Sequence, residues 1–234
     1  MSVLALDTST LVSSVALVNQ TTLLAEITLQ IRKTHSEQLM PHIAELMAFA
    51  GLQPTDLQAV AVSIGPGSFT GLRIGLATAK ALAYAQHIPI VGVSTLEALA
   101  YSLPVPGILI APMLDAQKDN VYHALYRWNG TNLETVVPAS VGNIDEVLSS
   151  LSALELPVFL LGEAAIQYSD KISDYPRLMK TPPQLIAARA ANIGMVGLNM
   201  ISRGITHSVM ELEPVYIRRS EAEVLWEKRQ GGCG

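Results

Sequence analysis

The sequence predicts an α/β fold of two lobes that face each other across a cleft. Both halves of the chain begin with strand-like segments in hairpin order and then alternate strands with helices. The first expected strand of each half ends in an aspartate, Asp7 in one and Asp115 in the other. This weak duplication is visible in the order of elements and not in residue identity. With 50% apolar and 15% charged residues among 234, the chain can bury a large core.

In the first half, strand-like runs are expected at 3–6, 14–18, 23–28, 59–64 and 88–93. A helix opens with a capping box at 34–37 and stops at Gly51, with Pro41 expected to kink or delay it. A second helix follows the glycine-rich segment 65–71 and continues to about residue 86. A third opens with the capping box 94–97 and ends near residue 102.

The segment 103–107, with two prolines and a glycine, is the expected linker, and the pattern restarts after it. Strand-like runs follow at 108–114, 120–128, 132–137 and 158–161, with a hairpin turn at Asn129-Gly130. Helices are expected at 145–154, 163–172 and 183–203, and a last one after the capping box 220–223.

Charge and cysteine content exclude several classes of protein. Fifteen Lys and Arg against twenty Asp and Glu give a net charge of −5, which argues against a chain that grips nucleic acid by itself. The single cysteine, Cys233, excludes an internal disulfide and a cysteine metal cage. No apolar run approaches the roughly 20 residues of a membrane span, and no basic start of a secretory leader is visible. We expect a cytoplasmic protein without membrane contact.

Two short motifs suit either an anion site or a plain backbone turn. The segment 65–71 follows a strand and opens a helix, so its N–H groups can face an anion. A tight turn needs the same glycines, and the Gly-Lys-Ser/Thr of a Walker loop is missing. The turn Asp7-Thr8-Ser9 offers a carboxylate and hydroxyls to a phosphate, to a Mg²⁺ shell or to its own backbone. At each motif both alternatives stay open.

The corresponding turn of the second half, 115–119, contains no glycine. A loop that cradles phosphate normally needs glycine for the close approach of its backbone, so the sequence argues against a triphosphate held from both sides. His35 and His42 lack the spacing of a zinc helix, which favours capping and surface roles.

The second helix is rich in small residues, and Gly71 and Gly75 are one turn apart. Because a glycine inside a helix costs about 1 kcal/mol relative to alanine, something close-packed must offset it. The sheet beneath the helix and another helix on top of it are both candidates, and the sheet is the commoner case.

Six segments stand in a specific order and spacing: 4–10 (LALDTST), 35–41 (HSEQLMP), 65–75 (GPGSFTGLRIG), 92–97 (GVSTLE), 115–122 (DAQKDNVY) and 213–218 (EPVYIR). Together they resemble the TsaB family, the dimerisation subunit of the bacterial machinery for tRNA threonylcarbamoyladenosine. The resemblance covers essentially the whole chain before the glycine-rich tail.

The resemblance implies the fold of actin, sugar kinases and chaperone ATPases, with two lobes of the ribonuclease-H type. It divides the chain into an N-terminal lobe with the dimerisation helices (1–105), a C-terminal lobe (106–210), a strand and helix that pack back on the lobes (211–230) and a flexible tail (231–234).

The resemblance also implies that the catalytic site has been lost. In the related catalytic subunit, TsaD, a His-x-x-x-His pair binds the metal, and Thr95 and Leu99 occupy the matching places here. Leucine cannot bind a metal, and one hydroxyl is a weak substitute for histidine. We expect no cofactor on this chain, with ATP and metal held by the partner subunits. The phosphate-loop positions are then vestigial: Asp7, Thr8, Ser9, Gly65, Gly67 and Asp115.

The implied function is that of a non-catalytic partner of TsaD, which acts together with the ATPase TsaE. The complex transfers threonylcarbamoyl to N6 of the adenosine next to the anticodon, in tRNAs that read codons starting with A, and this chain contacts tRNA only through the complex. A homodimer of the isolated chain is an alternative assembly, and a stand-alone nucleotide hydrolase or kinase is the rival function. The interface is expected on the first two helices, and some residues of the following set must instead face the lobe's own sheet: Leu39, Ile43, Leu46, Met47, Gly71, Leu72, Gly75, Ala79 and Leu82.

Overall fold

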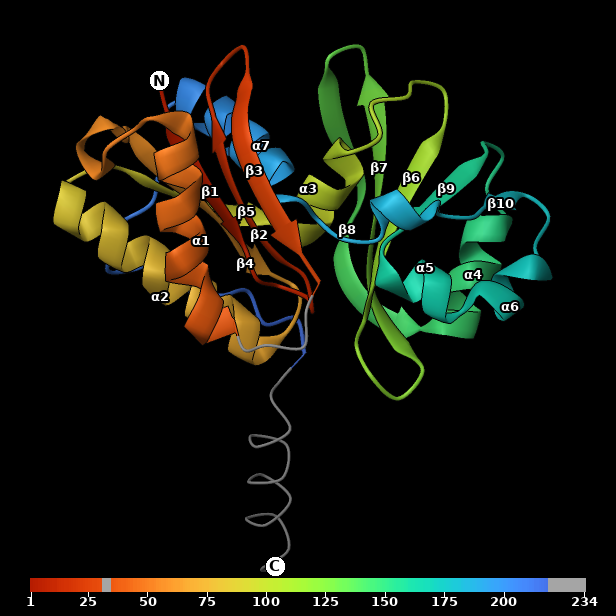
Figure 1. Ribbon diagram of the computed structural model, residues 1–234. Coiled ribbons are helices and arrows are strands. Elements are labelled where there is room, and N and C mark those ends of the chain that lie inside the picture. The colour runs from red at the N-terminus through yellow and green to blue at the C-terminus, as the bar shows by residue number, and fades with distance from the viewer. Residues whose placement is uncertain (31–34, 219–234) are drawn as a thin grey trace, which may run out of the picture.

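The computed structural model describes residues 1–30 and 35–218 and contains two five-stranded sheets, one in each lobe (Figure 1). The strand orders are β3-β2-β1-β4-β5 and β10-β9-β6-β7-β8. In both lobes the first strand pairs antiparallel with the second and parallel with a strand that comes later in the chain, β1 with β4 and β6 with β9. The predicted α/β duplication is therefore confirmed at the level of topology.

The first half of the chain forms β1 (Val3–Asp7), β2 (Ser13–Val18), β3 (Leu23–Leu29), α1 (His35–Ala50), η1 (Pro54–Asp56), β4 (Ala59–Gly65), α2 (Phe69–Gln86), β5 (Ile90–Ser94) and α3 (Thr95–Tyr101). The second half forms β6 (Leu109–Asp115), β7 (Asn120–Asn129), β8 (Asn132–Asn143), α4 (Ile144–Ser152), β9 (Val158–Leu161), α5 (Glu163–Gln167), α6 (Ser169–Ser173), β10 (Leu178–Met179), η2 (Pro183–Leu185) and α7 (Ala190–Ser202). None of the described helices is long and apolar enough to span a bilayer.

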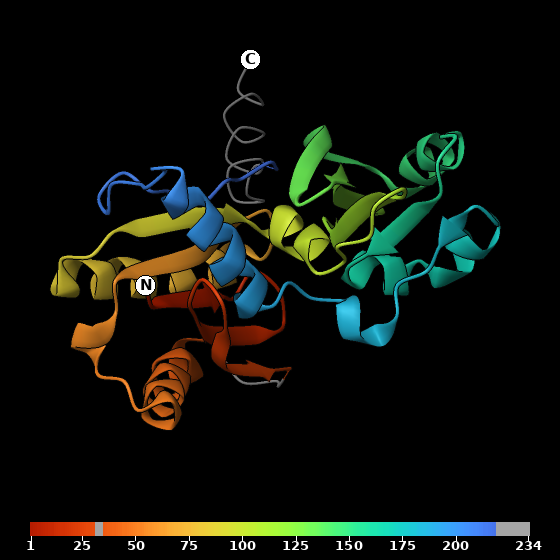
Figure 2. The same ribbon diagram turned by 90° about the horizontal axis from the view of Figure 1, so that it is seen from above.

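The central strands of the first sheet are buried on both faces, and their alternation separates two cores. Leu4 and Leu6 of β1 pack in one core with apolar residues of α1 and α2. Val3 and Ala5, which point to the opposite face, pack in another core with residues of α7. The view from above shows α1 and α7 on opposite sides of this sheet (Figure 2).

Helix α7 corrects the predicted boundary between the lobes. It falls in the segment 106–210 assigned to the C-terminal lobe, yet it packs against β1, β2, β4 and β5 of the first sheet. Two of its glycines make this possible, because a Cβ at Gly194 would crowd Val18 and one at Gly197 would crowd Ala61. The chain therefore returns from the second lobe to complete the core of the first.

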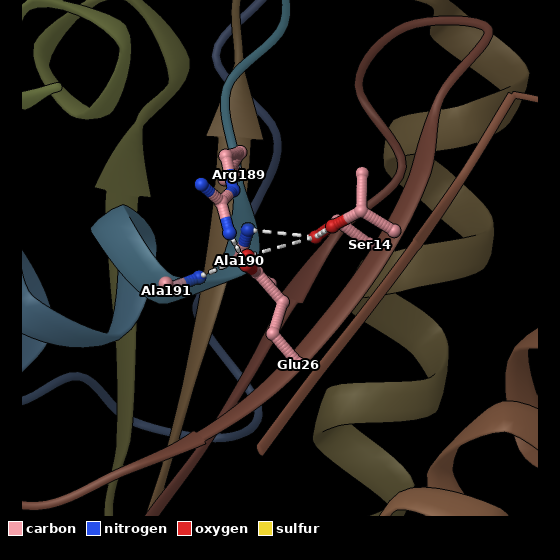
Figure 3. Close-up of polar contacts among 6 residues, drawn as sticks. Ser14, Glu26, Arg189, Ala190 and Ala191 are labelled. Carbon is pink, nitrogen blue, oxygen red and sulfur yellow. Dashed lines mark hydrogen bonds and ion pairs between the residues drawn. The ribbon is translucent and has the colours of Figure 1, made fainter. Parts of the chain in front are cut away.

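Polar groups of the first sheet hold the start of α7 in place (Figure 3). The backbone N–H of Ala190 donates to Ser14 Oγ at 2.9 Å, and that of Ala191 donates to Glu26 Oε1 at 3.1 Å. Glu26 also forms an ion pair with Arg189, and only 6% of its side chain is exposed. These bonds satisfy N–H groups that the first turn of a helix leaves without partners.

The core on the α7 side continues into the second lobe. Leu96 and Leu99 of α3 share it with Ile110, Leu114 and Leu161 of the second sheet. All five side chains are almost completely buried. The two lobes are thus joined by apolar packing as well as by the linker.

Several predicted element boundaries differ from the structure. The run expected at 132–137 is a strand to Asn143, the helix expected at 163–172 is two short helices, and the long helix expected from 183 begins only at Ala190. Pro41 lies inside α1 without ending it. The capping box at 34–37 lies partly, and the one at 220–223 and the tail 231–234 wholly, outside the described residues.

Candidate functional site

A large cleft of about 980 Å³ lies between the lobes. Ser9, which follows β1, and Gly67, which follows β4, line it from the first lobe. Asp115 at the end of β6 and Glu163 at the start of α5 line it from the second lobe. The carboxyl ends of parallel strands in α/β sheets are the usual place for a ligand, so this cleft is the candidate site.

Several polar groups of the turn after β1 bond to the protein itself, whereas the buried Ser9 hydroxyl has no hydrogen-bond partner among the described residues. Asp7 is fully buried, and its Oδ1 accepts hydrogen bonds from Ser63 Oγ at 2.5 Å and from the Ser9 N–H at 3.1 Å. The Thr8 hydroxyl donates to the carbonyl oxygen of Gly71 at 2.7 Å. Asp7 and Thr8 therefore lie beneath the cleft as structural groups, and Ser9 borders the cleft although only 1% of this residue is exposed.

The glycines of α2 allow this helix to press on the same turn. A Cβ at Gly71 would overlap the carbonyl oxygen of Thr8, and one at Gly75 would overlap the Thr8 hydroxyl. The Ser68 N–H donates to the Ser9 carbonyl oxygen at 2.6 Å, and Ser68 Oγ caps the helix by accepting from the Gly71 N–H at 3.2 Å. Close packing against the helix's own lobe thus offsets the propensity cost of its glycines.

The turn after β6 adopts a left-handed backbone conformation without glycine. Gln117, Lys118 and Asp119 all adopt left-handed backbone angles, with φ of 63°, 55° and 57°. The Asn120 side-chain amide holds the turn by donating to the carbonyl oxygens of Gln117 at 3.2 Å and of Lys118 at 2.9 Å. The Gln117 N–H donates to Asp115 Oδ1 at 3.1 Å, so this amide is also used locally.

Negative charge gathers on the second-lobe side of the cleft. Burial raises the pKa of Glu163, and the carboxylates of Asp115 and Asp7 raise it further against a lowering hydrogen bond from the backbone of Asp115. The pKa of Tyr122 is raised by burial, with Arg218 opposing that effect and Asp115 adding to it. An anionic ligand would therefore meet carboxylates on this wall.

A C-terminal strap, residues 213–218, runs along the cleft. It contacts Arg73, a cation of the cleft lining, and its own Arg218 bonds to the second lobe. The Val215 N–H donates to the Ile64 carbonyl oxygen at 2.7 Å, and the Tyr216 ring stacks on Phe69 with centroids 4.7 Å apart. Arg73 donates to the Tyr216 hydroxyl at 3.0 Å and lies over the Phe69 ring, and Arg218 donates to the carbonyl oxygen of Ala116. Only the first part of the packing predicted for 211–230 lies within the described residues.

The sequence did not identify Arg73, Glu163 or the ring stack on Tyr216 as parts of the cleft. Arg73 and Tyr216 stand inside segments 65–75 and 213–218, which were noted for their resemblance and not for their chemistry. Of the six predicted phosphate-loop positions, Ser9, Gly67 and Asp115 line the cleft. Asp7, Thr8 and Gly65 are buried beneath it.

The residues predicted for the partner interface lie inside the first lobe, which corrects their assignment to a contact surface. Most of their apolar side chains pack in the core beneath α1 and α2, Leu72 is buried beside Gly65, and the two glycines face Thr8. Leu82 is partly buried against that core, and the others are buried: Leu39, Ile43, Leu46, Met47, Gly71, Leu72, Gly75 and Ala79. The helical periodicity that identified them marks the face turned toward the sheet.

The outward faces of the same helices carry a different set of residues. On α1 they include Met40, Ala44, Ala48 and Phe49 beside the charged Glu37 and Glu45, and on α2 they include Arg73, Ala77, Ala81 and Tyr84. Phe49 is 73% exposed and Tyr84 is 61% exposed, which is unusual for aromatic side chains. Small residues between exposed aromatic groups allow a second helix to approach closely.

The positions that match the metal pair of TsaD are part of the core. Thr95 and Leu99 are both fully buried, and Leu99 packs between the lobes. Among the residues that the structure describes, no three His, Cys, Asp or Glu side chains gather in a metal-binding group.

Comparison with known proteins places these features in one family. The family model for TsaD, tRNA N6-adenosine threonylcarbamoyltransferase, matches residues 22–226. The tRNA threonylcarbamoyladenosine biosynthesis protein TsaB of Bacillus subtilis is 34% identical over 231 residues, which is 98% of this chain and 100% of that protein. TsaB of Escherichia coli is 31% identical and covers 99% of both chains.

Solved structures agree with this relationship. YeaZ from Pseudomonas aeruginosa superposes with a TM-score of 0.76 at 25% identity, over 92% of this chain and 99% of that one. A ROK hexokinase from Thermus thermophilus, at 12% identity and a TM-score of 0.50, shares the sugar-kinase fold alone and covers 87% of this chain and 100% of that one. The two-lobed actin-like fold is confirmed, and the chain belongs to the TsaB family.

Proposed function

We propose that the chain is a non-catalytic subunit in the biosynthesis of tRNA threonylcarbamoyladenosine. It pairs with the catalytic TsaD subunit and supports transfer of the threonylcarbamoyl group to N6 of the adenosine next to the anticodon. ATP and metal are held by TsaD and TsaE, and tRNA is contacted through the assembled complex. The names of the full-length relatives from Bacillus subtilis and Escherichia coli support the pathway.

The observation that carries the non-catalytic role is the internal use of backbone amides at both phosphate-loop positions. A phosphate cradle offers free N–H groups to its ligand. Here the amides of several loop residues donate to the protein itself, at Ser9, Ser68, Gly71, Ala116 and Gln117. A nucleotide would have to break these bonds before any of these five amides could bind it.

The buried positions at Thr95 and Leu99 support the same conclusion. A metal ligand at either place would need a polar, open environment, whereas Leu99 fills apolar core between the lobes. Replacing it with a polar side chain would bury that group without a designed partner. The chain is therefore suited to hold the two lobes rigidly rather than to perform chemistry between them.

The outward faces of α1 and α2 are the proposed contact surface for TsaD. Exposed Met40, Phe49 and Tyr84 provide apolar anchors, and Ala77 and Ala81 leave room for a partner helix. Such aromatic anchors surrounded by small residues are typical of protein interfaces. The same surface is available to a second copy of the chain when TsaD is absent.

A substitution on this surface tests the interface. Ala77→Arg places a long cation in the centre of the face and is expected to prevent co-elution with TsaD in size-exclusion chromatography. Ser149→Arg, an exposed position on α4 in the other lobe, adds the same charge elsewhere and should leave the complex intact. A folded Ala77→Arg chain that still co-elutes with TsaD would remove this helix from the interface.

Reconstitution tests the role itself. TsaD with TsaE and a source of the threonylcarbamoyl group should modify tRNA efficiently only when this chain is added. The isolated chain should show neither transfer nor ATP hydrolysis. Turnover by the isolated chain that disappears in Asp7→Asn would establish the rival function of a nucleotide hydrolase.

A further inference from the structure

A second pocket lies at the other end of the second sheet from the cleft. It has a volume of about 380 Å³ and is lined by α3, α7 and the turn between β7 and β8. Figure 1 shows this turn at the top of β7, whereas the turn after β6 that borders the cleft lies at the bottom. The two cavities share no lining residue. A pocket of this volume lies at the small end of the range for small-molecule sites.

Glu97 gives the pocket a carboxylate that the fold does not use. The sequence Ser94-x-x-Glu97 predicts a reciprocal capping box at the start of α3, and only half of it forms. The Glu97 N–H donates to Ser94 Oγ at 3.4 Å. Within the described part of the chain, the Glu97 carboxylate accepts no hydrogen bond and lines the pocket instead. Burial raises its pKa, and the charge of Arg203 opposes that shift.

Arg203 supplies the opposite charge to the same pocket. It is the C-cap residue of α7, where its backbone N–H bonds to the last turn. Its guanidinium acts on Glu97 electrostatically, yet the two side chains form no direct ion pair in the described residues. A carboxylate and a guanidinium therefore line one pocket without neutralising each other by contact.

The rest of the lining combines polar and apolar groups. Asn132 and Asn199 bring side-chain amides, and Leu133, Val196 and Met200 bring apolar surface. This composition matches a molecule that carries an ammonium group, a carboxylate and a short apolar side chain.

We propose that this pocket binds a free aliphatic α-amino acid, with the ammonium group on Glu97, the carboxylate on Arg203 and the side chain against Leu133, Val196 and Met200. The α3 and α7 helices and the β7–β8 turn come from different lobes, so the bound molecule joins both. A ligand that binds only this folded arrangement stabilises the chain.

Leucine and its two half-molecules test the charge requirement on the unmodified chain. L-Leucine is expected to bind in isothermal titration calorimetry and to raise the melting temperature. 3-Methylbutan-1-amine lacks the carboxylate and 4-methylpentanoate lacks the amine, and each should bind at least about tenfold more weakly. Equal binding of leucine and either half-molecule, or no binding of leucine at millimolar concentration, would overturn the proposal.

Substitutions then locate the site. Glu97→Gln and Arg203→Gln should each weaken leucine binding by about tenfold or more, because each removes one charged partner. Arg127→Gln removes a cation from the surface pair of Arg127 with Glu134, outside the pocket, and should leave binding unchanged. Leucine affinity that survives both pocket substitutions would place the binding elsewhere and refute the assignment.

Discussion

The two lobes share one topology but close the turn after their first strand in different ways. In the first lobe the turn at Asp7 is fixed from outside, by a glycine of α2 that lies more than sixty positions away in the chain. In the second lobe the turn at Asp115 is fixed from within, by left-handed residues and the neighbouring Asn120. In both lobes, backbone amides of the loop donate to groups of the protein itself.

This contrast shows that two equivalent turns can be kept ordered by different means, a helix glycine in one lobe and a side-chain amide in the other. Glycine in the first lobe serves close packing of a helix on a turn, as the overlap of a Cβ at Gly71 with Thr8 demonstrates. The absence of glycine in the second lobe leaves strained residues exposed beside the cleft. Gly71→Ala, Asn120→Ala and Gln117→Gly separate these two arrangements, and Glu163→Gln tests the charge on the wall of the cleft. The expected effects run from the largest to the smallest.

Gly71→Ala should have the largest effect, a loss of about 3 kcal/mol in the free energy of unfolding. The added methyl group would overlap the carbonyl oxygen of Thr8. Because this atom belongs to the backbone, it cannot move aside as the end of a flexible side chain could. Urea denaturation followed by circular dichroism measures the change. Ala77→Ser, on the exposed face of the same helix, is the control and should unfold like the parent. Equal stability of Gly71→Ala and the parent would show that α2 does not press on the turn.

Asn120→Ala should cost about 1–2 kcal/mol, because two backbone carbonyl oxygens of the left-handed turn lose their amide donor. The same denaturation experiment applies. Asn129→Ala removes an amide that, among the described residues, donates to exposed Glu134 at the other end of β7, and it should cost clearly less. A turn that is equally stable without the Asn120 amide would mean that its left-handed residues need no local support.

Glu163→Gln tests the electrostatics of the cleft through pH. The folded state raises the pKa of Glu163 above its ordinary value of 4.5, chiefly through burial, so the native protein binds this proton more tightly than the unfolded chain. Stability is therefore lost as pH rises through 4.5 and then through the folded pKa. Glutamine removes this loss. The melting temperature of the Glu163→Gln variant should exceed that of the parent at pH 7, and the difference should shrink toward pH 4. A difference that is constant with pH would contradict the shift.

Gln117→Gly should have the smallest effect and the opposite sign to Gly71→Ala. A left-handed conformation costs a non-glycine residue about 1–2 kcal/mol, and glycine costs about 0.5–1 kcal/mol in chain entropy, so a net gain of about 0.5 kcal/mol is expected. Thermal unfolding by calorimetry resolves such a difference. A loss of stability would indicate that the Gln117 side chain makes a contact that outweighs the strain.

The sequence predicted most strands, the helices α1 to α4 and the duplicated order, because these depend on local periodicity and capping. It misplaced α7 in the second lobe, because its contacts with Ser14 and Glu26 join residues more than 160 positions apart and leave no local pattern. It also took the periodic apolar residues of α1 for a partner surface. Periodicity at Leu39, Ile43 and Leu46 marks the buried face, and the proposed partner surface lies on the side that has no such pattern.

The sequence predicted which loops border the cleft but not which side chains contact one another in it. Asp7 and Asp115 marked the ends of the right strands. Arg73 lies over Phe69 and Tyr216 because the strap returns to the first lobe from the end of the second half. No residue spacing within either segment predicts this contact.

The central claim is that the chain acts through the outer face of its helices and not through the cleft. The most direct measurement is the rate of threonylcarbamoyladenosine formation on tRNA by TsaD and TsaE, with this chain as parent, Glu163→Gln or Ala77→Arg. We expect Glu163→Gln to stay within about twofold of the parent and Ala77→Arg to fall by about tenfold or more, as the loss of a central interface residue implies. Full activity with Ala77→Arg, combined with abolished activity in folded Glu163→Gln that still binds TsaD, would contradict the claim.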